Sequence, residues 1–306
     1  MPVSFPRLEV LPLLRVFKIE VYTNSEQNAI SLLFSGSSRL TQLTWQHPLD
    51  APTKPQIPWS QLSHLRLIDQ MSSFAALETI RLCLQLEHFT MRLTAESIGG
   101  LHPTTVKTHR LRTLSLGVPG HADCSPFFDS LILPELEEFI MIGARSNAAC
   151  GRRAFLDLLT RSNCKLYKLE LRHCAFEPFI ECLEHESFKS IQELKIKCSP
   201  HFTDDELIRL TDFPSPLAPR VLLPKLTHLT LRWCLHVSTG MLAEMVLSRR
   251  RQRDGHKTEP LQRLYVANQE LYEEDVKSIK DEAKEGFNGY ISAQFIICEG
   301  GERTSL

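Results

Sequence analysis

Four side chains near the middle of the sequence are of the types that bind zinc: His173, Cys174, Cys182 and His185. A structural zinc ion needs four ligands that converge in a tetrahedron. Cys182 and His185 would share one helix, whereas Cys174 follows a predicted strand and takes an inward-facing position at the far end of a turn from that helix. The four side chains are therefore not expected to converge, and we predict neither a metal site nor a cofactor.

A second group, His201 with Asp204 and Asp205, could in principle perform acid–base chemistry. The two aspartates lie in the first turn of a predicted helix, where carboxylates stabilise the helix dipole without any catalytic role. No Ser/His/Asp set and no glycine-rich phosphate loop accompanies them, and catalysis needs converging groups. The sequence predicts that the protein is not an enzyme.

The basic run from Arg249 to Arg253 could serve nuclear import or nucleic-acid binding. Arginines at the end of a helix are also favoured by its dipole, and the aromatic residues needed to stack single-stranded bases are not interleaved. We interpret the run as a solvated helix end and loop. Trp233, beside Cys234, is interpreted as a packing residue, and nucleic acid is not a predicted partner.

The composition is that of a globular protein with no global attraction to polyanions. The 306 residues are 42% hydrophobic and 23% charged, with a formal net charge of -1. The nine cysteines form no CxxC pair, and an odd number cannot all pair internally, so we expect reduced thiols in the cytoplasm or nucleus. The N-terminal residues do not resemble a signal peptide, and no apolar run is long enough for a membrane span.

The chain repeats the spacing apolar-x-x-apolar-x-apolar ten times. Most copies are separated by the interval of about 20–29 residues that leucine-rich repeats show, each with one short strand. Two longer intervals mark insertions at 212–223 and 249–260. The predicted strands are 14–20, 40–46, 62–68, 86–92, 111–117, 136–142, 166–172, 191–197, 226–232 and 261–267.

Helix signals fall between these strands. Helical spacing predicts a helix over Ser73–Leu84 with apolar positions at 74, 77, 80 and 84. Ser125 precedes a proline as an N-cap would, and Thr203 with Glu206 forms a capping box for a helix through Leu210. A helix over 270–285 and a strand over 290–298 are predicted to cap the C-terminal end. Only about a dozen residues precede the first strand. An uncovered edge strand tends to pair with another chain, so we expect that a segment is missing, swapped or bound at this edge.

These elements predict an α/β fold, a curved leucine-rich-repeat solenoid with a parallel concave sheet and helices on the convex face, forming one domain over residues 1–306. Neighbouring strands lie ~4.8 Å apart, whereas packed helices need roughly 8–10 Å. This difference demands curvature with the sheet inside. The predicted concave floor would cradle a protein rather than a small molecule.

Positions that alternate with the apolar template face the concave side. In the last four repeats they carry six basic and two acidic side chains, whereas those of the second, fifth and sixth repeats are mostly uncharged. We therefore predict a polarised array whose C-terminal half binds another protein through an acidic or phosphorylated segment. The alternative is that these are ordinary solvated strand residues. The predicted partner-binding residues are Lys168, Arg172, Lys195, Lys197, His228, Thr230, Arg232, Arg263 and Tyr265.

The most complete repeats place a cysteine, Cys174 or Cys234, eight residues after the first leucine. Cys234-Leu-His-Val-Ser238 followed by Thr239-Gly-Met-Leu242 resembles the cysteine-containing leucine-rich repeats of F-box-like proteins, and the irregular repeats with proline-rich insertions are similar to fungal examples. The resemblance implies substrate recognition for an F-box-type ubiquitin ligase adaptor. An F-box is not recognisable in this sequence, so binding of the ligase core would need one to be supplied. A repeat-only scaffold or inhibitor unconnected to ubiquitin is the alternative.

Overall fold

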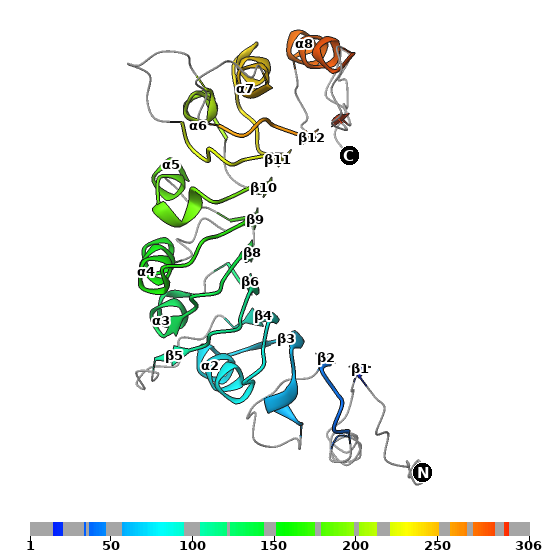
Figure 1. Ribbon diagram of the computed structural model, residues 1–306, viewed down its shortest axis with the longest axis vertical. Helices are drawn as coiled ribbons and strands as arrows, with labels where there is room; N and C mark the ends of the chain where they lie inside the picture. Colours follow the sequence, from blue (N-terminus) through cyan, green and yellow to red (C-terminus); the bar gives the residue numbers. More distant parts are fainter. Residues whose placement is uncertain are drawn as a thin grey trace. The chain divides into compact units, whose positions relative to one another are not determined.

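The structure is a computed structural model in which the chain forms two compact units, residues 1–164 and 165–306 (Figure 1). It describes residues 15–20, 34, 37–46, 57–94, 105–120, 123–143, 151–174, 179–198, 202–212, 221–250, 258–267, 272–284 and 291–293. Each unit contains a parallel sheet whose strands follow one another in sequence and alternate with helices. The predicted fold class, α/β with sequential parallel strands as in a leucine-rich-repeat solenoid, is confirmed.

The sheet of the first unit runs in the order β1-β2-β3-β4-β6-β8. Its strands are β1 (Val16–Glu20), β2 (Gln42–Gln46), β3 (His64–Met71), β4 (His88–Leu93), β6 (Thr113–Val118) and β8 (Glu138–Gly143). The central template residues pair in register from strand to strand, as Leu43, Leu65, Phe89, Leu114 and Phe139, and all five are buried. The apolar ladder that the spacing predicts is therefore the core of this unit.

The helices of the first unit lie on one side of this sheet (Figure 1). Those with described bounds are the 3₁₀ helix η1 (Trp59–Gln61), α2 (Ser73–Leu82), α3 (Ser125–Asp129) and α4 (Arg152–Ser162). A cluster of buried rings joins α3, α4 and β8: Phe139 and Phe155 stack with their centroids 4.3 Å apart, and Phe128 packs against both. We call the opposite face of each sheet the open face.

The prediction of α2 was correct to within two residues, but its buried face was partly wrong. Phe74 and Leu84 are 48% and 67% exposed. The Ser72 hydroxyl caps the helix by accepting from the Ala75 N–H at 3.2 Å. Leu77 and Ile80 reach the core as predicted, but smaller residues of the helix join them there in place of Phe74 and Leu84. The buried residues are Ala75, Ala76, Leu77, Thr79 and Ile80.

A second, two-stranded sheet was not predicted. It consists of β5 (Val106–Lys107) and β7 (Leu131–Ile132), which pair in parallel. β5 contacts α2, and β7 contacts α4. Strands of two residues are too short to show the alternation by which a strand is recognised in a sequence.

The second unit has the sheet order β9-β10-β11-β12-β13. Its strands are β9 (Lys168–Arg172), β10 (Glu193–Lys197), β11 (His228–Arg232), β12 (Arg263–Ala267) and β13 (Ile291–Ala293). Its helices are α5 (Phe179–Leu183), the 3₁₀ helix η2 (Glu186–Phe188), α6 (Asp204–Leu210), α7 (Met241–Arg250) and α8 (Glu273–Lys284). Parallel pairing of β13 with β12 confirms the position of the predicted C-terminal strand over these residues.

Carboxylates accept hydrogen bonds from backbone N–H groups at the starts of α6 and α7. The Thr203 backbone N–H donates to the Glu206 carboxylate at 2.8 Å, as a capping box requires. The buried Asp275 of α8 accepts from the backbone N–H groups of Gly240 at 2.9 Å and Ala243 at 2.7 Å, which ties α8 to the first turn of α7. Asp204 accepts from the Ser238 hydroxyl and N–H, and these bonds lower the pKa of Asp204. Asp204 thus has a structural partner.

Three strands of this unit are followed directly by a residue in the left-handed region: His173 (φ 54°), Cys198 (φ 50°) and Trp233 (φ 55°). Each continues the ladder, because its N–H donates to the carbonyl of the next strand, from His173 to Lys197 and from Cys198 to Arg232. Trp233 donates in the same way to Ala267. Non-glycine residues reach this conformation at a cost of about 1–2 kcal/mol, and the regular hydrogen bond offsets it.

The prediction that the end of α7 is solvated is wrong for Arg249, whose side chain is buried: the residue is only 2% exposed. Its guanidinium donates to the carbonyl oxygens of Leu210 (2.6 Å), Leu222 (2.6 Å) and Leu223 (3.1 Å). Burial lowers the pKa of Arg249 to about 10, and Asp212 opposes the shift, so the side chain is still a cation at neutral pH. It binds the last carbonyl of α6 and two carbonyls of the segment that leads into β11.

Several predictions concern residues outside those that the structure describes. These are residues 1–14, His201, Arg251 and Arg253, most of the two insertions (213–220 and 251–257), and 294–298. Within the described helices, none combines the length and apolar character needed to cross a lipid bilayer. The seven cysteines whose surroundings are described are all free thiols.

Candidate functional site

The nine predicted partner-binding residues all lie on β9–β12, at positions that alternate with the buried template residues. The parallel register aligns them in three rows across the open face. The rows are Lys168, Glu193, His228, Arg263; then Glu170, Lys195, Thr230, Tyr265; and last Arg172, Lys197, Arg232, Ala267. The structure thus brings the nine residues together on one sheet, and whether they bind a partner stays a prediction.

Glu170 differs from the solvated strand residue that its position suggests, because it is only 4% exposed. Its carboxylate accepts from Arg172 Nε at 2.7 Å and from Lys197 Nζ at 2.8 Å. Burial raises the pKa of Glu170, but the hydrogen bonds and charges of Lys197 and Arg172 outweigh it, so the pKa lies below its ordinary value. Glu170 is therefore an ionised anchor that holds two of the predicted basic residues.

Glu193 plays a similar part in the first row. Its carboxylate lies 3.8 Å from Lys168 Nζ and also forms an ion pair with Lys195. Two carboxylates thus hold four of the six basic residues of this face. The excess of positive charge predicted from the sequence is correct as a sum, but much of it is locally neutralised.

The remaining cations, Arg232 and Arg263, lie on β11 and β12. Within the part of the chain that the structure describes, neither forms an ion pair with a carboxylate, and the buried Nε of Arg232 has no hydrogen-bond partner. The Arg232 guanidinium carbon lies 6.0 Å from the centre of the Tyr265 ring, within the range of a cation–π contact. These side chains form the arginine–tyrosine surface, which we define as His228, Thr230, Arg232, Arg263 and Tyr265.

His228 supports the same surface as a neutral group. Burial and the neighbouring Arg263 and Lys195 lower the pKa of His228, while Glu193 opposes the shift. Its Nδ1 lies 2.9 Å from the Thr227 hydroxyl. At neutral pH the imidazole therefore adds hydrogen-bonding capacity without adding charge.

Three of the residues considered for zinc binding are buried in the core or hydrogen-bonded to the backbone. Cys174 and Cys182 are buried, and Cys174 Sγ lies 3.1 Å from the Arg172 carbonyl oxygen. His185 Nδ1 accepts from the Ser187 N–H at 3.2 Å at the start of η2. Among the described residues, no three His, Cys, Asp or Glu side chains are grouped so that they could hold a metal ion. Burial raises the pKa of the inward-facing Cys234 to about 12, so its thiol is protonated at neutral pH.

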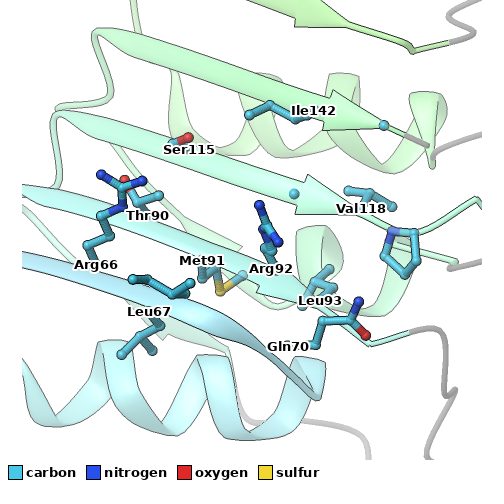
Figure 2. A pocket seen from close by; sticks show the side chains of 14 residues that line it. Arg66, Leu67, Gln70, Thr90, Met91, Arg92, Leu93, Ser115, Val118 and Ile142 are labelled. Carbon is cyan, nitrogen blue, oxygen red and sulfur yellow. The ribbon is translucent and has the colours of Figure 1, made fainter. Parts of the chain in front are cut away.

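The prediction of mostly uncharged positions covers the second, fifth and sixth repeats only. The third and fourth repeats add two cations to the first unit, because β3 and β4 place Arg66 and Arg92 on the open face. The side chains of these arginines line a hollow of about 270 Å³ over β3, β4, β6 and β8, shown in Figure 2. The same alternation of buried and open-face positions, applied to the third and fourth repeats, predicts both arginines on the open face. Gly117, on the same face, signals a close approach.

A scan of the chain against models of known protein families gives no match, and a search of curated proteins finds no significant relative.

Proposed function

We propose that the protein is a recognition module that binds another protein through the open face of β9–β12. The observation that carries this proposal is the arginine–tyrosine surface, where Arg232 and Arg263 project from a sheet whose other basic residues are held by Glu170 and Glu193. A guanidinium is suited to paired hydrogen bonds with carboxylate or phosphate. An acidic or phosphorylated segment is the ligand class that this surface fits.

Rigidity supports the proposal. The Glu170 anchor fixes Arg172 and Lys197, and the parallel ladder fixes the spacing of the rows. Preorganised donors lose less conformational entropy when a ligand binds. A segment lying across β11 and β12 would meet two guanidinium groups and the Tyr265 ring on strands whose spacing the parallel ladder fixes.

Within this binding role, we further propose substrate recognition for an F-box-type ubiquitin ligase adaptor, working in the cytoplasm or nucleus. The support is the position of Cys174 and Cys234 after their strands, as in the repeats of that family. Both thiols face the core, where they are buried. A scaffold or inhibitor unconnected to ubiquitin would use the same surface without delivering its partner to a ligase.

Charge reversal of Arg232→Glu with Arg263→Glu is expected to lower recovery of the bound protein at least about tenfold, because two favourable contacts become repulsive. The measurement is quantitative mass spectrometry of proteins that co-purify with the tagged chain from cells. The matched control, Lys165→Glu with Lys277→Glu, makes the same charge change at exposed residues away from this surface. Unchanged recovery by the first variant would contradict the proposed surface.

The same experiment separates the two roles. Cullin-type ligase subunits recovered together with the partner, from a chain that includes an F-box, would support the adaptor. If such a chain recovers the partner and no ligase subunit, the scaffold or inhibitor role is the correct one.

A further inference from the structure

The hollow over β3, β4, β6 and β8 lies at the carboxyl ends of these strands, where the register between β3 and β4 shifts between Arg66 and Gln70. The register places Arg66, Thr90 and Ser115 in one row across the sheet, and Arg92 and Gly117 two residues further along. Figure 2 shows the side chains of these rows around a common space. At about 270 Å³, the space is large enough for a small organic group.

The charge of this hollow is positive. Arg66 and Arg92 are both exposed, and neither guanidinium forms a hydrogen bond or an ion pair with another described residue. No carboxylate is among the described residues that line the hollow. The hydroxyl groups of Thr90 and Ser115 add two neutral donors to the lining of the hollow. Guanidinium and hydroxyl donors together suit an oxyanion with several acceptor oxygens.

Gly117 shapes the floor of the hollow. A Cβ at this position would lie only 2.8 Å from Cγ of Arg92, so the Arg92 side chain passes directly over the glycine. Gly117 in turn pairs with Ile142 of β8, which is 36% exposed. Together with Val118 and Pro119, Ile142 gives the hollow an apolar wall beside its cationic end.

We propose that this hollow binds an organic phosphate monoester, with the phosphate between Arg66 and Arg92 and the apolar body against Ile142, Val118 and Pro119. Two guanidinium groups match the double charge of a phosphate better than the single charge of a carboxylate. The hollow is formed by residues 66–143 and shares no residue with the arginine–tyrosine surface. The inference therefore goes beyond the proposed function, and either can fail without the other.

Isothermal titration calorimetry with phenyl phosphate tests this site. We expect one saturable site with a Kd on the order of 0.1–1 mM, and binding at least about tenfold weaker for inorganic phosphate, which cannot use the apolar wall. A phosphotyrosine peptide distinguishes the sources of the ligand. Tighter binding of the peptide than of phenyl phosphate assigns the site to a modified protein, and equal or weaker binding assigns it to a free phosphate ester.

Two variants locate the binding. Arg92→Gln removes one cation, and Gly117→Ala keeps every charge but displaces the Arg92 side chain, so each is expected to weaken phenyl phosphate binding by about tenfold. Arg81→Gln, an exposed arginine of α2 outside the hollow, is the matched control and should bind like the wild type. Thermal unfolding of each variant verifies that it folds. The proposal is overturned if phenyl phosphate shows no saturable binding, or if both folded variants bind it as tightly as the control.

Discussion

Replacing Arg249 by methionine is expected to lower the free energy of unfolding of the C-terminal unit by about 3–5 kcal/mol. Methionine fills a similar volume but donates no hydrogen bond. The carbonyl oxygens of Leu210, Leu222 and Leu223 would lose the donors that now reach them at 2.6, 2.6 and 3.1 Å. A buried carbonyl left without a partner costs about 1–3 kcal/mol. This applies to Leu210 and Leu222, whereas Leu223 keeps the Leu226 N–H at 3.0 Å and loses only one of two donors.

Urea unfolding followed by circular dichroism measures this change. Lys277→Met provides the control, because it exchanges a cation for methionine at an exposed position of α8 in the same unit and is expected to change stability by less than about 0.5 kcal/mol. Equal stability of the Arg249 and Lys277 variants would mean that the Arg249 hydrogen bonds contribute nothing.

Glu170→Gln is expected to destabilise the same unit by about 1–3 kcal/mol at pH 7. Glutamine has nearly the same shape but no charge, so Arg172 and Lys197 would share one neutral oxygen in place of an ionised carboxylate. Glu244→Gln, at an exposed site on α7, provides the matched control. A loss no larger than that of the control would show that Glu170 is not an anchor.

The pH dependence of this effect has a defined sign. The folded-state pKa of Glu170 lies below its ordinary value of 4.5, so the folded protein holds the carboxylate in its charged form more strongly than the unfolded chain does. This contribution is complete above pH 4.5 and is lost as the pH falls through the folded-state pKa. The difference in unfolding free energy between wild type and Glu170→Gln is therefore expected to shrink between pH 5 and pH 3. A difference that stays constant over this range would contradict an ionised Glu170.

The strands were predictable because burial on one face imposes alternation on the sequence. Leu229 and Leu231 of β11 are buried while His228, Thr230 and Arg232 are not, and a spacing of two residues records this directly. The helices show a weaker pattern in the sequence. In α2 the small Ala76 and the buried Thr79 occupy the core-facing side while Phe74 is exposed, so hydrophobicity alone indicates only part of the buried face.

The candidate site was predicted as a set of positions but not as a set of interactions. Alternation placed Glu170 on the open face correctly, but its burial depends on Lys197, which comes from the next strand. Arg249 shows the same difficulty at a larger distance, because its acceptors Leu210 and Leu223 belong to other elements. Contacts between residues far apart in the chain leave no periodic signal, so a charged side chain at a helix end appears solvated.

Site-specific photo-crosslinking tests the central proposal, partner binding by the open face of β9–β12, most directly. A benzophenone amino acid would be placed at Thr230 on β11 or at Glu244 on the exposed side of α7, and crosslinked products would be compared from intact cells. We predict a protein adduct from position 230 that disappears when Arg232 and Arg263 are both replaced by glutamate. An adduct from position 244 and none from position 230 would contradict the proposal and place the interaction on the helical side.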